Sequence, residues 1–294
     1  MKMCLVVAIA VSCGTCMAKS DSLIDSYLGK NQDVAGTSQC LVVAFTVKSQ
    51  NNQFEDRGQP GRLGTGKAVF GNGCMAYQIN YAYDSLPKYR KKGYSGYEKV
   101  DYDREDNLVY WRQSARSGYF DRNFDRCADL MECCRISPSG KLVGKTSSKH
   151  SANCKSPGDD MAVNYLEMAL GIDQNKFLKR GSFQAAKPDG GNSYTQTFAG
   201  EGSAGTGTHG IWKVQLGRNG NHVRTAQFTP TGLNLPALSI YTTGTVSAGN
   251  RTFPKDAEVV QQPGQMPTFY KLTAVSTASD LASALKPFRD EVEK

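Results

Sequence analysis

Short runs in which apolar and polar residues alternate, separated by turn residues, dominate the last third of the chain. The run 210–216, GIWKVQL, places Trp212, Val214 and Leu216 on one side of an extended strand and polar side chains on the other. Runs of the same texture continue through 222–261, and the Asn-Gly and Thr-Gly steps between them are typical of tight hairpin turns. The pattern predicts an antiparallel meander with one buried and one solvated face.

The same texture appears in the first half of the chain, so the predicted fold class is mainly β with a few helices (α+β). Further strands are expected at 40–47, 63–70, 74–83, 97–106, 107–120 and 268–275, with hairpin turns at 71–73 and 139–140. Residues 121–134 are ambiguous. Helices are expected at 20–29, 159–178 and 278–288; Gly29 would end the first, and Gly171 would divide the second.

Residues 1–18 have the composition of a secretory signal peptide, with one basic residue, a short apolar run and small residues near a cleavage site. Cleavage there leaves 19–294 as a single β-rich exported domain. Alternatively, the tetrad 10–13, AVSC, has the form of a bacterial lipobox, and processing there attaches a diacylglyceryl group to Cys13. Both routes stay open. Each predicts an exported protein in the periplasm, in the outer envelope or outside the cell.

Six cysteines remain after the leader, and an even number in an exported chain predicts disulfides, because that compartment is oxidising. The candidates are Cys40, Cys74, Cys127, Cys133, Cys134 and Cys154. Together with His150, the last four offer the ligand types of a zinc site, but the usual Cys-x-x-Cys spacing is missing. We therefore predict disulfides in place of a metal site, and the pairing stays open.

The chain is basic: 35 Lys and Arg oppose 27 Asp and Glu, for a net charge of +8. This balance favours anionic surfaces such as phospholipid headgroups, although a solvated surface explains it more simply. The cluster 88–92, KYRKK, is the best candidate for a local basic patch. Export argues against a nucleic-acid partner, so a lipid or an anionic membrane surface is the partner that the charge suggests.

No nucleotide-binding motif in the sequence has both the required residues and the required context, although the run 200–210 matches Gly-x-Gly-x-x-Gly twice. The run 61–67, GRLGTGK, lacks the Ser or Thr that a phosphate-binding loop needs after its lysine, and 139–146 lacks the first glycine. The glycine-rich run 200–210 opens onto a strand, whereas a dinucleotide site requires a helix at that point. The three histidines lie in unrelated segments. We therefore predict no catalytic residues, no metal and no cofactor.

An acidic cluster at 101–106 is the one place where carboxylates gather as hydrolysis would require. Asp101, Asp103 and Glu105 alternate, so on a strand they would share one face, which an ordinary solvated face explains. A secreted glycan-directed hydrolase that uses Asp103 or Asp106 stays as the alternative function.

The order of elements resembles that of the LolA/LolB-like lipoprotein carriers of bacteria: a short helix, a long meander, a helical insert, a second meander and a terminal helix, over most of 20–288. The resemblance implies a strongly curved antiparallel sheet, or half-open β-barrel, with a helical lid over a cavity for acyl chains. The helix at 159–178 would be the lid. Residues for the concave face are Trp212, Val214, Leu216, Phe228, Leu238 and Ile240. The same residues would equally form a filled core.

The function predicted first is that of an exported, non-enzymatic binding protein for a lipid or another acyl ligand, held in the concave face of the sheet. The alternatives are the secreted hydrolase and an envelope lipoprotein, anchored through Cys13, with a structural role.

Overall fold

The computed structural model describes residues 23–32, 39–49, 61–90, 101–121, 125–152, 161–172, 183–186, 192–199, 209–218, 220, 222–261 and 267–293. The predicted leader, Cys13, Cys154 and most of the glycine-rich run 200–210 lie outside these residues.

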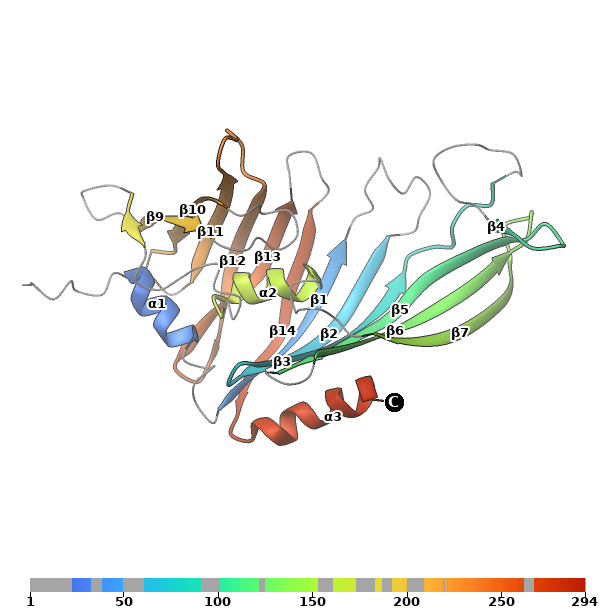
Figure 1. The fold of residues 1–294 in the computed structure, drawn as a ribbon, viewed down its shortest axis with the longest axis horizontal. Coiled ribbons are helices and arrows are strands. Elements are labelled where there is room, and N and C mark those ends of the chain that lie inside the picture. Colours follow the sequence, from blue (N-terminus) through green and yellow to red (C-terminus); the bar gives the residue numbers. More distant parts are fainter. Residues whose placement is uncertain are drawn as a thin grey trace, which may run out of the picture.

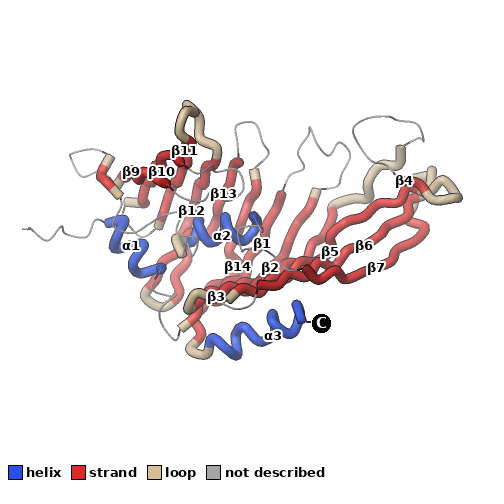
Figure 2. Tube along the Cα trace, viewed as in Figure 1, coloured by secondary structure: helices blue, strands red, loops and turns tan. Residues whose placement is uncertain are grey.

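A single antiparallel sheet of 14 strands forms the body of the protein (Figures 1 and 2). Its order is β7-β6-β5-β3-β2-β1-β14-β13-β12-β11-β10-β9-β8, and β4 pairs with β5 alone. The bounds are β1 Cys40–Ser49, β2 Arg62–Gly71, β3 Cys74–Tyr83, β4 Asp101–Tyr102, β5 Leu108–Phe120, β6 Asp125–Ile136, β7 Leu142–Ala152, β8 Gln184–Ala185, β9 Ser193–Ala199, β10 His209–Leu216, β11 Val223–Pro230, β12 Leu238–Ala248, β13 Arg251–Gln261 and β14 Thr268–Ala278. The strands at the two edges, β7 and β8, do not pair with each other, so the sheet is open.

The sheet consists of two meanders, which are joined where the first strand of the chain pairs with the last. The N-terminal half, β1–β7, runs outward from the centre to one edge, and the C-terminal half, β8–β14, runs from the other edge back to the centre. They meet where β1 pairs with β14, from Cys40 opposite Ala278 to Ser49 opposite Thr268. One ladder between the two ends of the chain therefore makes the halves continuous.

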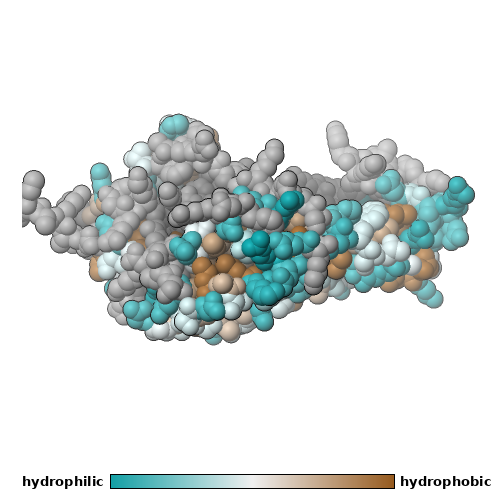
Figure 3. Space-filling view, turned by 60° about the horizontal axis from the view of Figure 1, so that its bottom comes forward, coloured by the Kyte–Doolittle hydropathy of each residue, from teal (hydrophilic) through white to brown (hydrophobic). Residues whose placement is uncertain are grey.

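Three helices lie on the sheet within the described residues: α1 Leu23–Gln32, α2 Met161–Leu170 and α3 Leu281–Glu293. Helices α1 and α2 lie on one face, which we call the inner face, and α3 lies on the opposite, outer face (Figure 1). A large hydrophobic cluster joins α1 and α2 to both halves of the sheet, and a smaller one joins α3 to β1, β2, β3, β5 and β6. Viewed from the α3 side, hydrophilic residues gather over the middle of the surface, with apolar patches beside them (Figure 3).

The hairpin between β2 and β3 shows how the turn residues fix the register. Asn72 and Gly73 have positive φ angles of 47° and 72°, as a tight two-residue turn requires. Gly71 then lies opposite Cys74, and the pairing continues to Arg62 opposite Tyr83. This hairpin and the one around Gly140, between β6 and β7, are confirmed.

Two predicted elements differ from the structure. The strand expected at 97–106 is confined in the described residues to Asp101–Tyr102, because Asp103 accepts hydrogen bonds from the backbone N–H of Glu105 and Asn107 and closes a turn there. Residues 121–134, which were ambiguous, contribute to the long strand β6.

The helices also differ in their ends. Helix α1 continues past Gly29 to Gln32. Helix α2 ends at Leu170, so the helix expected at 159–178 is interrupted at Gly171, as predicted, and residues 173–178 lie outside the described residues. Gly171 has a φ of 69°, its N–H bonds to the carbonyl of Met168, and the N–H of Ile172 bonds to that of Glu167, a pattern that ends helices. Helix α3 is longer than expected and is capped by Asp280, which accepts from the Ser283 N–H.

Candidate functional site

Cross-strand register gathers the six predicted ligand-binding residues on the inner face of the C-terminal half. Trp212 lies opposite Phe228, and Phe228 lies opposite Leu238. In the neighbouring row, Val214 and Ile240 lie on either side of an alanine of β11. All six are buried, with exposed fractions of 0–2%: Trp212, Val214, Leu216, Phe228, Leu238 and Ile240. The face is therefore continuous, apolar and covered.

Helices α1 and α2 form the cover of this face, and they contact each other. The Tyr27 hydroxyl donates to the carbonyl of Leu170 at 3.3 Å, which joins α1 to the last turn of α2. A Cβ at Gly171 would lie 2.7 Å from the Tyr27 ring, so a glycine is needed both for its positive φ and for this contact. The helix end and the tyrosine therefore fix how the two helices sit together.

A polar contact at the middle of α2 joins this helix to the sheet. The Gln261 amide at the end of β13 donates to the hydroxyl of Tyr165 on α2. Burial raises the pKa of Tyr165, and the bond from Gln261 opposes that rise. Tyr165 therefore stays a neutral phenol at physiological pH.

Among the buried polar atoms of this layer, a donor on β10 and an acceptor on β9 have no hydrogen-bond partner within the described residues. They are Nε1 of Trp212 and Oε1 of Gln196. Gln196, on β9, lies directly opposite Trp212 and is 3% exposed, while Trp212 is 0% exposed. A buried donor and a buried acceptor therefore stand side by side, next to the apolar side chains of Phe228 and Leu238 in the same row. Sequence analysis did not single out Gln196.

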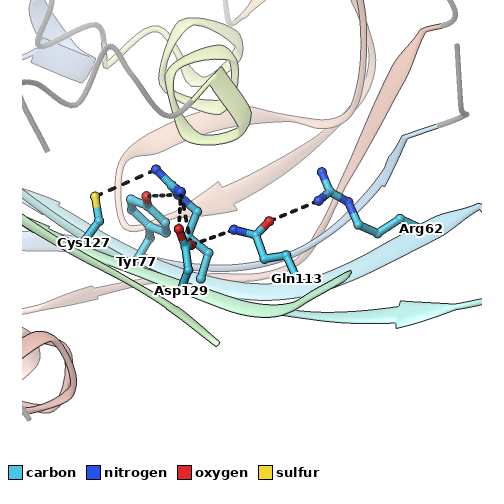
Figure 4. A network of polar contacts seen from close by, with 6 residues as sticks. Arg62, Tyr77, Gln113, Cys127 and Asp129 are labelled. Carbon is cyan, nitrogen blue, oxygen red and sulfur yellow. Dashed lines mark hydrogen bonds and ion pairs between the residues drawn. The ribbon is translucent and has the colours of Figure 1, made fainter. Parts of the chain in front are cut away.

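The N-terminal half carries a different kind of inner surface, a network of polar side chains on β2, β3, β5 and β6 (Figure 4). Arg116 bonds to both carboxylate oxygens of Asp129, at 3.1 and 3.0 Å, and its Nε donates to the Tyr77 hydroxyl at 3.3 Å. The amide of Gln113 donates to Asp129 at 2.6 Å, and its carbonyl accepts from Arg62 at 3.1 Å. Each charged group of the network has a partner, so the network fixes the strands rather than awaiting a ligand.

A second ionic group lies farther along the same strands. Glu132 accepts from Arg112 at 3.0 Å and pairs with Lys145 at 2.5 Å. Burial opposes ionisation of Glu132, but the bonds from Lys145 and Arg112 outweigh it and lower the pKa of this carboxyl. The Arg112 guanidinium also lies 4.7 Å from the ring centre of Tyr83.

The carboxylates of the alternative hydrolase lie in a turn rather than on a strand. Both oxygens of Asp103 bond within the turn, to backbone N–H groups and to the Asn107 side chain at 3.1 Å. These bonds, led by the one from Asn107, lower the pKa of Asp103. Asp106 has a φ of 57°, so it serves the same turn. Asp103 acts here as a turn-forming acceptor.

The cysteines are found mostly as thiols. Cys40, Cys74, Cys133 and Cys134 are not disulfide-bonded, whereas Cys127 is, to a partner outside the described residues. The prediction that all six pair therefore differs from the structure at four positions. Cys133 and Cys134 are neighbours on β6, where successive side chains point to opposite faces, so they cannot pair with each other without distorting the strand. Across the described residues, no group of three or more His, Cys, Asp or Glu could hold a metal ion.

Solved structures similar to this chain share its architecture at very low sequence identity. A domain from Vibrio parahaemolyticus assigned to outer membrane lipoprotein sorting is 9% identical, and the match covers 92% of this chain and 100% of that chain with a TM-score of 0.46. A LolA superfamily protein from Nitrosomonas europaea is 8% identical over 89% of this chain and 96% of that chain, with a TM-score of 0.45. Nothing about the ligand or partner of this chain follows from a similarity at this level.

No protein-family model matches the sequence, and no curated protein matches it. Within the described residues, no helix has the length and apolar composition needed to cross a membrane.

Proposed function

We propose that the chain is an exported, non-enzymatic binding protein that takes up the acyl chain of a lipid on the inner face of its C-terminal half. The observation that supports this most is the apolar face of the open sheet, which two ten-residue helices cover. Each buried CH₂ of an acyl chain contributes about 0.8 kcal/mol, so a long chain can replace the contacts that the helices make.

Entry of the ligand requires the cover to move. The six inner residues are 0–2% exposed while α1 and α2 lie over them, so an acyl chain reaches them by displacing helix side chains. The contact between Tyr27 and the carbonyl of Leu170 keeps the helices together, and they can shift as a unit. Binding is therefore coupled to the position of the cover, and α2 acts as the lid.

The place of action that we propose is the bacterial envelope. The predicted leader directs the chain out of the cytoplasm, and the net charge of +8 suits an anionic membrane surface from which a lipid is taken. Intact mass of the mature protein from its native host distinguishes a diacylglyceryl group on Cys13 from cleavage after residue 18. A lipid anchor keeps the protein at the membrane, and simple cleavage makes it a mobile carrier.

The two tryptophans allow a direct test of the acyl site. Trp212 is buried in the inner face, and Trp111 is 52% exposed on β5. In Trp111→Phe, Trp212 is the sole tryptophan, and bromine on an acyl chain quenches indole fluorescence at near contact. We expect dibromostearoyl glycerol or dibromostearate to quench this variant, with no quenching by the unbrominated chains.

The reciprocal variant, Trp212→Phe, keeps Trp111 and serves as the matched control. Its fluorescence should be unaffected by the brominated chains. Equal quenching of Trp111 and Trp212 would indicate non-specific adsorption, and no quenching of Trp212 by either compound would rule out an acyl site on this face.

A further inference from the structure

The buried pair of Trp212 and Gln196 is the feature of the inner face that an acyl chain alone does not explain. Trp212 is 0% and Gln196 3% exposed, and neither Nε1 of the first nor Oε1 of the second is hydrogen-bonded within the described part of the chain. An unsatisfied buried polar group costs about 1–3 kcal/mol. Two of them side by side, one donor and one acceptor, point to a ligand that brings the complementary groups.

The position of the pair in the sheet gives the ligand an orientation. One row across the strands reads Gln196, Trp212, Phe228, Leu238 and Gln261, and the next reads Tyr194, Val214, Ala226, Ile240 and Val259. The first row carries the polar atoms, and the second is apolar apart from the Tyr194 hydroxyl. A molecule that lies across both rows therefore places its polar group at Trp212 and its chain along the second row.

The chemistry of the two atoms defines the polar group. An indole N–H only donates, so it requires an acceptor such as a carbonyl oxygen, and an amide oxygen requires a donor such as a hydroxyl. Neither row contains Lys or Arg, so a carboxylate buried there would have no cation in either row. The pair therefore favours an uncharged group that carries both a carbonyl and a hydroxyl.

Building on the proposed acyl site, we propose that its ligand is a neutral acyl ester with a free hydroxyl, of the monoacylglycerol type. The ester carbonyl accepts from Nε1 of Trp212, and the hydroxyl donates to Oε1 of Gln196. The anion of a free fatty acid is disfavoured, because its carboxylate would lose its hydration on binding and would find no cation in either row.

Three ligands with the same chain separate these contributions: mono-oleoylglycerol, which has the carbonyl and hydroxyls; methyl oleate, which has the carbonyl alone; and oleate, which is charged. Displacement of a fluorescent acyl probe from the full chain at pH 8 gives the dissociation constant of each. We expect mono-oleoylglycerol to bind most tightly, followed by methyl oleate and then oleate, with about a fivefold step for each hydrogen bond.

Two variants assign the steps to residues. Gln196→Met should weaken mono-oleoylglycerol about fivefold and leave methyl oleate unchanged, whereas Trp212→Phe should weaken both. Gln227→Met makes the same chemical change on β11, where the amide bonds to Ser239 and Tyr241, and should alter none of the three constants.

Each other outcome overturns a defined part of the proposal. If wild type binds none of the three ligands, the acyl site itself is wrong, and this inference with it. If wild type binds all three equally, or oleate best, the acyl site stands and the neutral ester is wrong. If both variants lower the melting temperature of the ligand-free protein but leave the ratios of the three constants unchanged, Trp212 and Gln196 bond to each other and not to a ligand.

Discussion

The strands β9–β12 of the C-terminal half and the strands β5–β7 of the N-terminal half use the same antiparallel architecture but different chemistry. In the C-terminal half, Trp212 and its neighbours form apolar rows under two helices. In the N-terminal half, Arg116 with Asp129, and Glu132 with Arg112 and Lys145, tie the strands β5, β6 and β7 together. An apolar layer can exchange one apolar partner for another at little cost, whereas a network of paired charges loses stability when any member leaves. The difference suits the ligand exchange that we propose for the C-terminal half and a rigid frame in the N-terminal half.

The largest expected effect tests the apolar half. Trp212→Ala removes a fully buried indole and should lower the free energy of unfolding by about 4 kcal/mol. Trp111→Ala, in the N-terminal half, removes a side chain that is 52% exposed and should cost no more than about 0.5 kcal/mol. Urea unfolding of the two variants measures both values, and similar losses would show that the apolar rows do not carry the core.

The next effect tests the ionic half. Glu132→Gln leaves Arg112 and Lys145 without their carboxylate and should destabilise the protein by about 2 kcal/mol. The exposed pair of Lys149 with Glu291 is the control, and Glu291→Gln should change stability by less than about 0.5 kcal/mol.

The same carboxyl makes the N-terminal half sensitive to acid. Because the pKa of Glu132 is lower in the folded state than its ordinary value of 4.5, the unfolded chain binds the proton more readily as the pH falls. The stability that Glu132 contributes is therefore complete above pH 4.5 and is lost as the pH falls through the folded-state value. Unfolding curves between neutral pH and acid should converge for wild type and Glu132→Gln; a constant difference would contradict the assignment.

An effect of similar size tests the cover. Gly171→Ala forces a side chain into a φ of 69° and against the Tyr27 ring, and should cost about 2 kcal/mol. Gly73→Ala meets a similar φ of 72° with nothing within 4 Å, so it should cost about 1 kcal/mol. The difference between the two variants in thermal unfolding reports the contact between α1 and α2. Equal costs would show that Tyr27 does not press on the end of α2.

The smallest effect concerns the bond that joins the two helices. Tyr27→Phe removes the donor to the Leu170 carbonyl and should cost about 1 kcal/mol. Amide exchange should rise in α2 more than in β5 and β6, since the cover is loosened and the ionic frame is not. Tyr241→Phe, which removes the hydroxyl of a 39% exposed tyrosine on β12, should leave the exchange rates of α2 as they are. A rise in the exchange of α2 in this variant would contradict the link between Tyr27 and the cover.

Much of the fold could be predicted, because strand alternation and turn residues act locally. The alternation at Trp212, Val214 and Leu216 predicts one buried face, and all three side chains lie on it. The strand β6 was ambiguous because both of its faces are partly covered, so apolar and polar residues do not alternate strictly. The strand expected at 97–106 was wrong for most of its described part, since the Asp103 side chain competes for the backbone N–H groups.

The candidate site could be predicted in part. The six inner residues follow from periodicity within each strand. Gln196 could not be predicted in this way, because its importance depends on which residue of β10 lies opposite it. The register between two strands joined by a long connection cannot be predicted from the sequence of either strand alone. The cover could likewise be expected as a helix, but its contact through Tyr27 and Gly171 depends on two segments far apart in sequence.

The ladder between β1 and β14 has a consequence for the order of folding. Within each meander, strands that are neighbours in sequence pair, so only short loops have to close. By contrast, β1 and β14 come from opposite ends of the chain, so their pairing requires a long loop to close. Until β14 has been synthesised, β1 has one unpaired edge, and its residues Leu41, Val43 and Phe45 belong to the core. The ladder between β1 and β14, at the centre of the finished sheet, is thus the last part of the sheet to form. A chaperone that holds the emerging chain would have to shield the unpaired edge of β1.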